Sequence, residues 1–192
     1  MRIEHIKASE LNTTKWSGGT TTQLAIYPKE AEYKKLNFLF RISTASVEAE
    51  ESNFTKLPNV SRKLMILDGK IKIKHENHHS KIIKKFEQDK FSGNWETKSY
   101  GKATDFNLMT IGNSAGEIEA IAFNHFKSIS LKSEFNYYGF YIFKGEAKLS
   151  IQDHIINANK GDVISIYSEN EIGEIDLQAT HDCEVILCKI KY

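Results

Sequence analysis

Hydrophobic and polar residues alternate with a period of two along much of this chain, in short runs that turn residues separate. The alternation is clearest over residues 70–74 (Lys-Ile-Lys-Ile-Lys) and 147–151 (Ala-Lys-Leu-Ser-Ile). Further strand candidates are residues 38–47, 63–67, 106–111, 118–123, 138–143, 162–166 and 181–190. Helical periodicity is weak everywhere and amounts to a turn or two at most. Many short strands at regular spacing predict an all-β sandwich or barrel.

The strand pattern contains a repeat. Residues 66–73 (Ile-Leu-Asp-Gly-Lys-Ile-Lys-Ile) match residues 142–149 (Ile-Phe-Lys-Gly-Glu-Ala-Lys-Leu) at an offset of 76. A polar turn, an apolar pair and an acidic turn follow each copy. This order is typical of a double-stranded β-helix, the jelly-roll barrel, so two copies predict two fused barrels with few short helices. We expect the first barrel in residues 1–115 and the second in residues 116–192, and strands exchanged between them remain an open alternative.

The composition is that of an ordinary globular protein. The chain has 192 residues, of which 40% are hydrophobic and 27% charged, and 26 basic residues balance 25 acidic ones. This balance creates no strong field that would attract nucleic acid or an anionic membrane. No apolar run approaches the roughly 18 to 20 residues of a membrane span, and the N-terminus lacks the apolar core of a secretory signal. We therefore expect a cytoplasmic protein without a nucleic-acid or membrane partner.

The two cysteines agree with that compartment. Cys183 and Cys188 lie in one predicted strand, which places them about 17 Å apart on opposite faces. A disulfide needs Cα atoms within roughly 7 Å of each other. We expect two free thiols, and their spacing is not that of zinc ligands.

Arginine is rare in this chain and is therefore informative. Only Arg2, Arg41 and Arg62 are arginine among the 26 basic residues. Arg41 shares one face of a predicted strand with Ser43 and small residues. The planar guanidinium group pairs with a carboxylate in a way that lysine does not. Arg41 is thus either a ligand-binding residue or a structural arginine buried with a carboxylate partner.

A second polar stripe lies in the predicted strand 105–111, where Asp105, Asn107 and Met109 share one face and large apolar residues the other. We expect this stripe to face the Arg41 stripe across a hollow in the mouth of a barrel. Burying so many polar groups costs several kcal/mol unless each is paired. The fold or a ligand must therefore supply the partners.

Residues 16–24 (Trp-Ser-Gly-Gly-Thr-Thr-Thr-Gln-Leu) are the third feature. The paired glycines allow close approach of the backbone, and the threonines supply hydroxyl groups. No Gly-Lys-Ser/Thr follows, so this is not a phosphate loop. Trp16 and Thr20 are candidate ligand contacts, and a glycine turn leading into an edge strand is the alternative.

Three histidines, His75, His78 and His79, lie at a predicted hairpin tip, where polar residues often collect without a function. A metal-binding barrel of this type needs His-x-His, then Glu, then a later His, all pointing inward. Of the three, only His75 has inward parity, and it is alone. We therefore expect neither a metal nor another cofactor.

Residues 112–116 (Gly-Asn-Ser-Ala-Gly) match the Gly-x-Ser-x-Gly pattern of serine hydrolases, and Asp162 and His181 follow in the hydrolase order. That nucleophile turn requires a helix directly after it and a parallel sheet around it. The following residues 117–123 indicate no helix, and the chain lacks βαβ spacing. We expect a linker turn here.

Taken in order, six segments make the chain resemble the HutD/Ves family, bacterial bicupin proteins linked to histidine utilisation and stress response. The segments are residues 16–21, 40–47, 54–62, 67–69, 91–95 and 105–109. The resemblance covers roughly residues 5–190, although the half beyond about residue 117 matches only as a generic cupin pattern. It implies two fused β-barrels without the cupin metal triad. It also implies a small-molecule-binding modulator of histidine catabolism.

These observations predict that the N-terminal barrel binds a small polar, carboxylate-bearing metabolite, such as a histidine-pathway acid. In this hypothesis Arg41 pairs with the carboxylate, while Ser43 and Asn107 hydrogen-bond to the ligand. Asp105 orients Arg41 or accepts a ligand N–H. The remaining candidates are the apolar walls Trp16 and Met109, the hydroxyl of Thr20, and Arg62 as a second clamp or a turn anchor.

Two alternatives remain open. The first is a metal-free isomerase or lyase in which Asp105 is the general base. The second is a non-catalytic structural or partner-binding bicupin with a filled barrel. Exposed barrel edges would also allow a homodimer.

Overall fold

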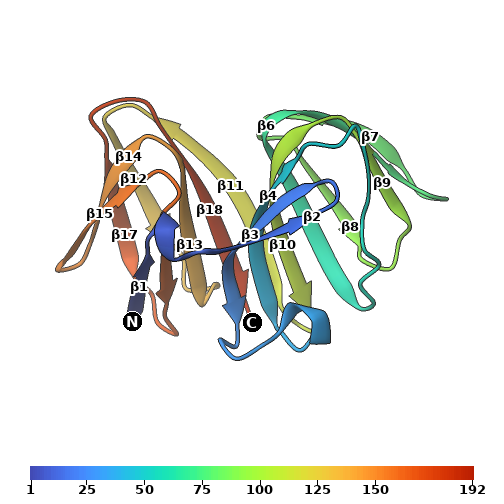
Figure 1. Ribbon diagram of the computed structural model, residues 1–192. Coiled ribbons are helices and arrows are strands. Elements are labelled where there is room, and N and C mark those ends of the chain that lie inside the picture. Colours follow the sequence, from blue (N-terminus) through green and yellow to red (C-terminus); the bar gives the residue numbers. More distant parts are fainter. The chain divides into compact units, whose positions relative to one another are not determined.

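The computed structural model describes all 192 residues, and the chain divides into two compact units. The N-terminal unit comprises Asn12–Ser114, and the C-terminal unit combines Ala115–Tyr192 with Met1–Leu11. Both units consist almost entirely of β-strands, as expected (Figure 1). The two helices, η1 (Ala8–Glu10) and η2 (Tyr33–Lys35), are single 3₁₀ turns. No helix is long and apolar enough to cross a membrane.

The N-terminal unit is a jelly roll whose two sheets share one long strand, β6. Its strands are β2 (Asn12–Trp16), β3 (Gly19–Tyr27), β4 (Phe40–Val47), β5 (Glu51–Asn53), β6 (Val60–His75), β7 (Ser80–Lys84), β8 (Gln88–Ser92), β9 (Thr97–Tyr100) and β10 (Ala103–Ile111). The first half of β6 lies between β10 and β8 in a sheet that continues through β4, β3 and β2. Its second half lies between β7 and β9, and β9 pairs with β5.

The sequence of β6 explains how it serves both sheets. The Lys-Ile alternation of residues 70–74 places Ile71 and Ile73 in the core, because successive strand side chains point to opposite faces. Gly69 stands between the two halves with a φ of +83°. A Cβ at this position would lie 2.6 Å from the carbonyl oxygen of Lys102, so no other residue fits without a shift of the backbone.

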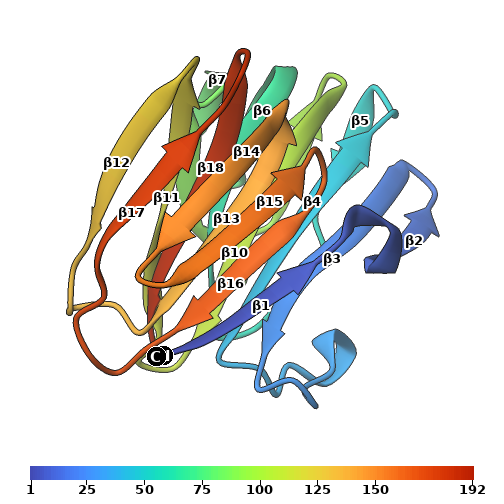
Figure 2. The same cartoon turned by 90° about the vertical axis from the view of Figure 1, so that its left-hand side faces the viewer.

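The C-terminal unit has a five-stranded sheet in the order β1-β16-β13-β18-β11 and a four-stranded sheet in the order β12-β17-β14-β15. Figure 2 shows the four-stranded sheet with its strands side by side. The strands are β1 (Arg2–Ile6), β11 (Ala115–Phe123), β12 (Phe126–Leu131), β13 (Tyr137–Lys144), β14 (Glu146–Ile151), β15 (His154–Asn159), β16 (Val163–Tyr167), β17 (Gly173–Gln178) and β18 (Cys183–Lys191). Side chains of both sheets form one apolar core, with Tyr138, Phe140 and Leu187 among its buried residues.

The sequence repeat corresponds to a glycine bend that occurs at the equivalent place in both units. Gly145, which precedes β14, has a φ of +78°, and a Cβ there would lie 2.7 Å from the carbonyl oxygen of Asp182. Gly69 is held in the same way against Lys102. The offset of 76 residues therefore relates two glycine bends that each direct the chain from one sheet of a jelly roll into the other.

The first eleven residues depart from the predicted division. They were expected in the first barrel, but β1 pairs with β16, with Ile3 opposite Ile166. The carboxylate of Asp162 holds this segment, because it lies 3.0 Å from His5 Nε2 and accepts the backbone N–H of Ala8 at 2.9 Å. The physical reason is that the alternation within a strand does not specify its partner, and β1 adds to the C-terminal unit's sheet at the edge formed by β16.

Two further expectations concern single residues. Cys183 and Cys188 are both buried in β18 and both free, as the strand spacing predicted. The residues after Ser114 form strand β11 instead of a helix. Residues 112–114 form the turn between β10 and β11, residues 115 and 116 begin β11, and the segment does not form the nucleophile turn of a hydrolase.

The Gly69 bend yields a stability prediction. Gly69→Ala should lower the free energy of unfolding by about 2–4 kcal/mol, because it adds a backbone collision to the cost of a positive φ. Gly112→Ala is the matched control, since Gly112 has a φ of +66° but nothing within 4 Å of its would-be Cβ. It should cost about 1 kcal/mol. Urea denaturation followed by circular dichroism measures both, and equal losses would contradict the collision argument.

Candidate ligand-binding site

Three neighbouring strands, β4, β10 and β6, present polar side chains on one face of the sheet in the N-terminal unit. Arg41 lies opposite Met109, and Met109 lies opposite Arg62, so these side chains form one row across the strands. Two residues further along β4, Ser43 lies opposite Asn107. Because strand side chains alternate between faces, each of these residues projects to the same side.

These side chains line a cavity of about 310 Å³. The sequence-predicted residues among its lining are Trp16, Arg41, Ser43, Arg62, Asp105, Asn107 and Met109. Thr20 does not line it, whereas its neighbour Thr21 does. Thr21 is paired with Ala45, which is on the face of Arg41, and Thr20 therefore points to the other side of β3.

The two polar stripes are neighbours instead of facing walls. The prediction that Arg41 and Asn107 lie on opposite walls of a hollow was wrong, because their strands β4 and β10 are hydrogen-bonded neighbours. Both stripes therefore project from one sheet. Ser52 of β5, Phe54 in the following segment and Ser99 of β9 contribute to the remaining lining.

Arg41 is buried without a carboxylate partner. Its Nε donates to Gln23 Oε1 at 2.9 Å, and its Nη1 donates to Ser43 Oγ at 3.1 Å. The guanidinium carbon lies 4.3 Å from the centre of the Tyr33 ring. Burial lowers the pKa of Arg41 from its usual value, and the neighbouring Tyr33 opposes this shift. The ion pair that a purely structural arginine would form is missing.

Arg62 lies inside strand β6, not in a turn, and is 5% exposed. Its Nη2 donates to Asn107 Oδ1 at 3.3 Å, and its guanidinium carbon lies 4.9 Å and 5.1 Å from the rings of Phe54 and Phe91. Its Nε has no hydrogen-bond partner. Burial lowers the pKa of Arg62 to about 10, so the group remains charged at neutral pH.

Asp105 is the acidic group of the cavity. Burial raises the pKa of Asp105 to about 7, against the opposing effects of the Arg62 charge and of Asn107. Its carboxyl group therefore changes charge near neutral pH. The cationic neighbour that acts on it is Arg62, so the predicted role of orienting Arg41 has no support in the geometry.

Unpartnered polar atoms gather at this cavity. The buried side-chain atoms without a hydrogen-bond partner are Asp105 Oδ1, Arg62 Nε and Ser52 Oγ, and all three residues line it. Buried polar groups in proteins are nearly always paired. A molecule bound in this cavity could therefore supply the hydrogen-bond partners that these three atoms lack.

Trp16 supplies an apolar part of the lining at the open edge of β2, where it is 39% exposed. Its ring lies over Gly18, since a Cβ on Gly18 would come within 2.2 Å of Trp16 Cζ3. The Trp-Ser-Gly sequence thus allows the indole ring to fold back over the turn. Met109 is 4% exposed and separates the two arginines.

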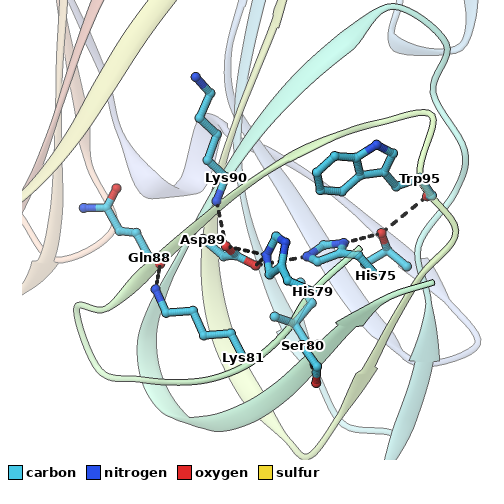
Figure 3. A network of polar contacts seen from close by, with 10 residues as sticks. His75, His79, Ser80, Lys81, Gln88, Asp89, Lys90 and Trp95 are labelled. Atoms are coloured by element: carbon cyan, nitrogen blue, oxygen red, sulfur yellow. Dashed lines mark hydrogen bonds and ion pairs between the residues drawn. The ribbon is translucent and has the colours of Figure 1, made fainter. Parts of the chain in front are cut away.

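Sequence parity missed one cluster in this unit. His75 was expected to be alone, but His79 and Asp89 lie beside it (Figure 3). Asp89 lies on the buried face of β8, two residues before the buried Phe91. That alternation was readable in the sequence, whereas the pairing of β6 with β7 and β8 was not.

Solved structures identify the fold class. The conserved protein of unknown function PA5104 from Pseudomonas aeruginosa PAO1 matches with a TM-score of 0.88 at 16% identity, covering 100% of both chains. The cupin 2 conserved barrel domain protein from Leptotrichia buccalis matches with a TM-score of 0.59 at 13% identity, covering 98% of this chain and 96% of that one. The fold of the chain is therefore the jelly-roll barrel that these structures share.

The family follows from the sequence comparison. The HutD family profile matches residues 8–187, and the chain belongs to that family. The structure of HutD from Pseudomonas fluorescens SBW25 is similar with a TM-score of 0.73 at 14% identity, covering 100% of both chains. No curated protein sequence matches the chain.

Asp105 predicts a pH dependence of stability. Its folded-state pKa of about 7 lies above the usual value, so the protonated form is favoured in the folded protein. The contribution of Asp105 to stability is then fully present below about pH 4 and is lost as the pH rises through about 7, by up to roughly 4 kcal/mol. Asp105→Asn should remove this loss and exceed the wild type in stability at pH 8. Urea denaturation between pH 4 and 8 measures it.

The control for this series is Asp153→Asn, which changes an exposed carboxylate in the turn between β14 and β15. Its pH profile should remain parallel to that of the wild type. An Asp105→Asn profile that is also parallel to the wild type would contradict the buried, high-pKa carboxyl group.

Proposed function

We propose that this protein binds a small carboxylate-bearing metabolite in the cavity of its N-terminal unit and thereby modulates histidine utilisation or a stress response. The observation that carries the proposal is that two buried guanidinium groups, those of Arg41 and Arg62, line one cavity and neither forms an ion pair with a carboxylate. A buried charge is costly unless it is paired. A ligand anion is the partner that the cavity lacks.

The charge balance favours an anion. Two guanidinium groups are opposed by one carboxyl group, that of Asp105, whose pKa is about 7. Around neutral pH the lining therefore carries a net positive charge. A carboxylate can accept two parallel N–H bonds from a guanidinium group, which gives both affinity and orientation.

The size and lining limit the ligand. A volume of about 310 Å³ lies at the small end of ligand pockets. Arg41 and Arg62 belong to strands separated by β10, so their backbones are about 10 Å apart. This span suits a ligand whose carboxylate lies near Met109. Ser43, Asn107 and Ser52 would then hydrogen-bond to other polar groups of the ligand, with Trp16 and Phe54 against its apolar part.

Membership of the HutD family makes histidine-pathway acids the first ligands to test. A cytoplasmic location is part of this proposal, and the two free, buried cysteines are compatible with it. The proposal requires neither nucleic acid nor membrane as a partner. It also requires no second copy of the chain.

A second candidate function is a metal-free isomerase or lyase with Asp105 as the general base. The observation in its favour is a buried carboxyl group with a pKa of about 7 and an unpartnered oxygen at the cavity. A general base is most effective when its pKa lies near the working pH. The third alternative, a purely structural bicupin, is disfavoured by the open volume, since such a protein would have a filled barrel.

The binding proposal predicts a loss of affinity in Arg41 variants. Urocanate, formylated glutamate and unrelated organic acids should be screened by thermal shift, and any hit measured by calorimetry. A ligand carboxylate should raise the Tm of the wild type in a saturable way. Arg41→Lys and Arg41→Ala should weaken its binding at least tenfold, because a charge-assisted bidentate contact is worth about 1.5–3 kcal/mol.

Arg2→Ala is the matched control for the removal of an arginine, because Arg2 has a 60% exposed side chain and does not line the cavity. It should leave binding unchanged. The proposal fails if no acid in the panel changes the Tm of the wild type. It also fails if folded Arg41→Ala binds a hit as tightly as the wild type does.

The affinity should depend on pH in a direction that separates the two candidate functions. When Asp105 ionises above about pH 7, it repels a ligand carboxylate, so the Kd should rise roughly tenfold between pH 6 and pH 8. Asp105→Asn should flatten this profile in calorimetric titrations. A general base would instead give turnover that increases through pH 7 and disappears in Asp105→Asn.

A further inference from the structure

A cluster of three side chains, here called the histidine cluster, consists of His75, His79 and Asp89 (Figure 3). It is separate from the cavity lined by Arg41 and Arg62, here called the arginine cavity, since none of the three residues lines that cavity. His75 ends β6, His79 directly precedes β7, and Asp89 lies in β8. One ligating atom of each side chain lies within 4.8 Å of those of the other two. Three segments of the jelly roll thus converge on one point.

The carboxylate of Asp89 stands between the two imidazole rings. Its Oδ2 lies 3.0 Å from His75 Nε2 and 3.0 Å from His79 Nε2. A tetrahedral metal ion with bonds of about 2.0–2.2 Å separates its ligand atoms by roughly 3.3 Å. The observed separations are therefore near those that an ion would impose.

The hydrogen bonds behind His75 orient its ring. Thr97 Oγ1 donates to the carbonyl of Trp95 at 3.3 Å, so its oxygen accepts from His75 Nδ1 at 2.7 Å. The lone pair of His75 Nε2 is then directed at Asp89. With Nδ1 as the donor to Thr97, the contact of 3.0 Å between Nε2 and Oδ2 requires either a proton on one of the two groups or a metal ion bound by both atoms. An N–H bond behind the ligating nitrogen is typical of metal-bound histidine.

The surroundings fix the cluster and leave one side open. The His75 side chain is completely buried, and its ring lies 4.5 Å from that of Phe91. Asp89 Oδ1 also accepts the backbone N–H of Lys90 at 3.0 Å. The nearby ammonium of Lys81 donates to the backbone carbonyl of Gln88 at 2.7 Å and not to Asp89 (Figure 3). The His79 side chain is 42% exposed, which gives solvent access to one side of the cluster.

We propose that His75, His79 and Asp89 bind a divalent first-row transition metal ion, for which Zn²⁺ is the best fit. Two imidazoles and one carboxylate are the donors that such ions prefer, whereas Mg²⁺ and Ca²⁺ prefer sites made of oxygen atoms. Three protein ligands leave the fourth position of Zn²⁺ for water or a further ligand. The sequence-based expectation of no metal considered only the His-x-His spacing, which this site does not use.

The test is a titration of chelator-treated, full-length protein with Zn²⁺, followed by calorimetry, with Mg²⁺ as the comparison ion. The wild type should bind one Zn²⁺ with a Kd of 10 µM or tighter, and Mg²⁺ should give no heat. His79→Gln and Asp89→Asn should each weaken Zn²⁺ binding at least tenfold. Co²⁺ should give a visible absorption spectrum that His79→Gln abolishes.

His78→Gln is the matched control, because His78 is in the same turn but stacks on Trp95 at a ring distance of 3.7 Å and is outside the cluster. It should bind Zn²⁺ like the wild type. His79→Gln is the decisive variant, since the exposed side chain of His79 can be replaced without disturbing the core. Equal Zn²⁺ affinities of wild type and His79→Gln, or no binding by the wild type, would overturn the proposal and leave a hydrogen-bonded cluster only.

Carboxylate binding measured on the same samples separates this inference from the proposed function. The metal site predicts that His79→Gln loses Zn²⁺ but still binds a carboxylate hit as the wild type does. Arg41→Ala should show the reverse. Either proposal can thus fail while the other stands.

Discussion

A side chain at position 69 would collide with the carbonyl oxygen of Lys102, and this restriction makes the bend of β6 available only to glycine. Because of the bend, one strand contributes to both sheets of the N-terminal unit. The half before the bend carries Arg62 to the arginine cavity, and the half after it carries His75 to the histidine cluster. Both candidate sites therefore depend on a single backbone conformation.

The arginine cavity differs energetically from the rest of the interior. Elsewhere buried polar groups are satisfied, as where Tyr137 Oη and Ser165 Oγ lie 3.0 Å apart in the C-terminal unit. At the cavity, Arg62 and Asp105 leave atoms unpaired and have pKa values displaced by burial. Such unpaired groups reduce stability. A ligand that supplied the missing contacts would recover part of this loss as binding free energy.

Side-chain parity predicted much of this site, and its failures have identifiable causes. Alternation correctly grouped Arg41 with Ser43 and Asp105 with Asn107, since local parity depends only on the strand itself. It gave no information on whether β4 and β10 are neighbours or opposite walls, because strand order is a long-range property. Three successive threonines carry no hydrophobic pattern, so Thr20 and Thr21 were indistinguishable. Likewise, the approach of His79 and Asp89 to His75 depends on two separate strand pairings.

The strand that the C-terminal unit takes from the start of the chain has a consequence for biosynthesis. His5 and Asp162 are 157 residues apart, so β1 leaves the ribosome long before its neighbour β16 exists. At about 5–20 residues per second this delay is roughly 8–31 s. During that time the contiguous segment Asn12–Ser114 is already available to fold. Strand β1 must therefore remain without its neighbour β16 while the residues between them are synthesised.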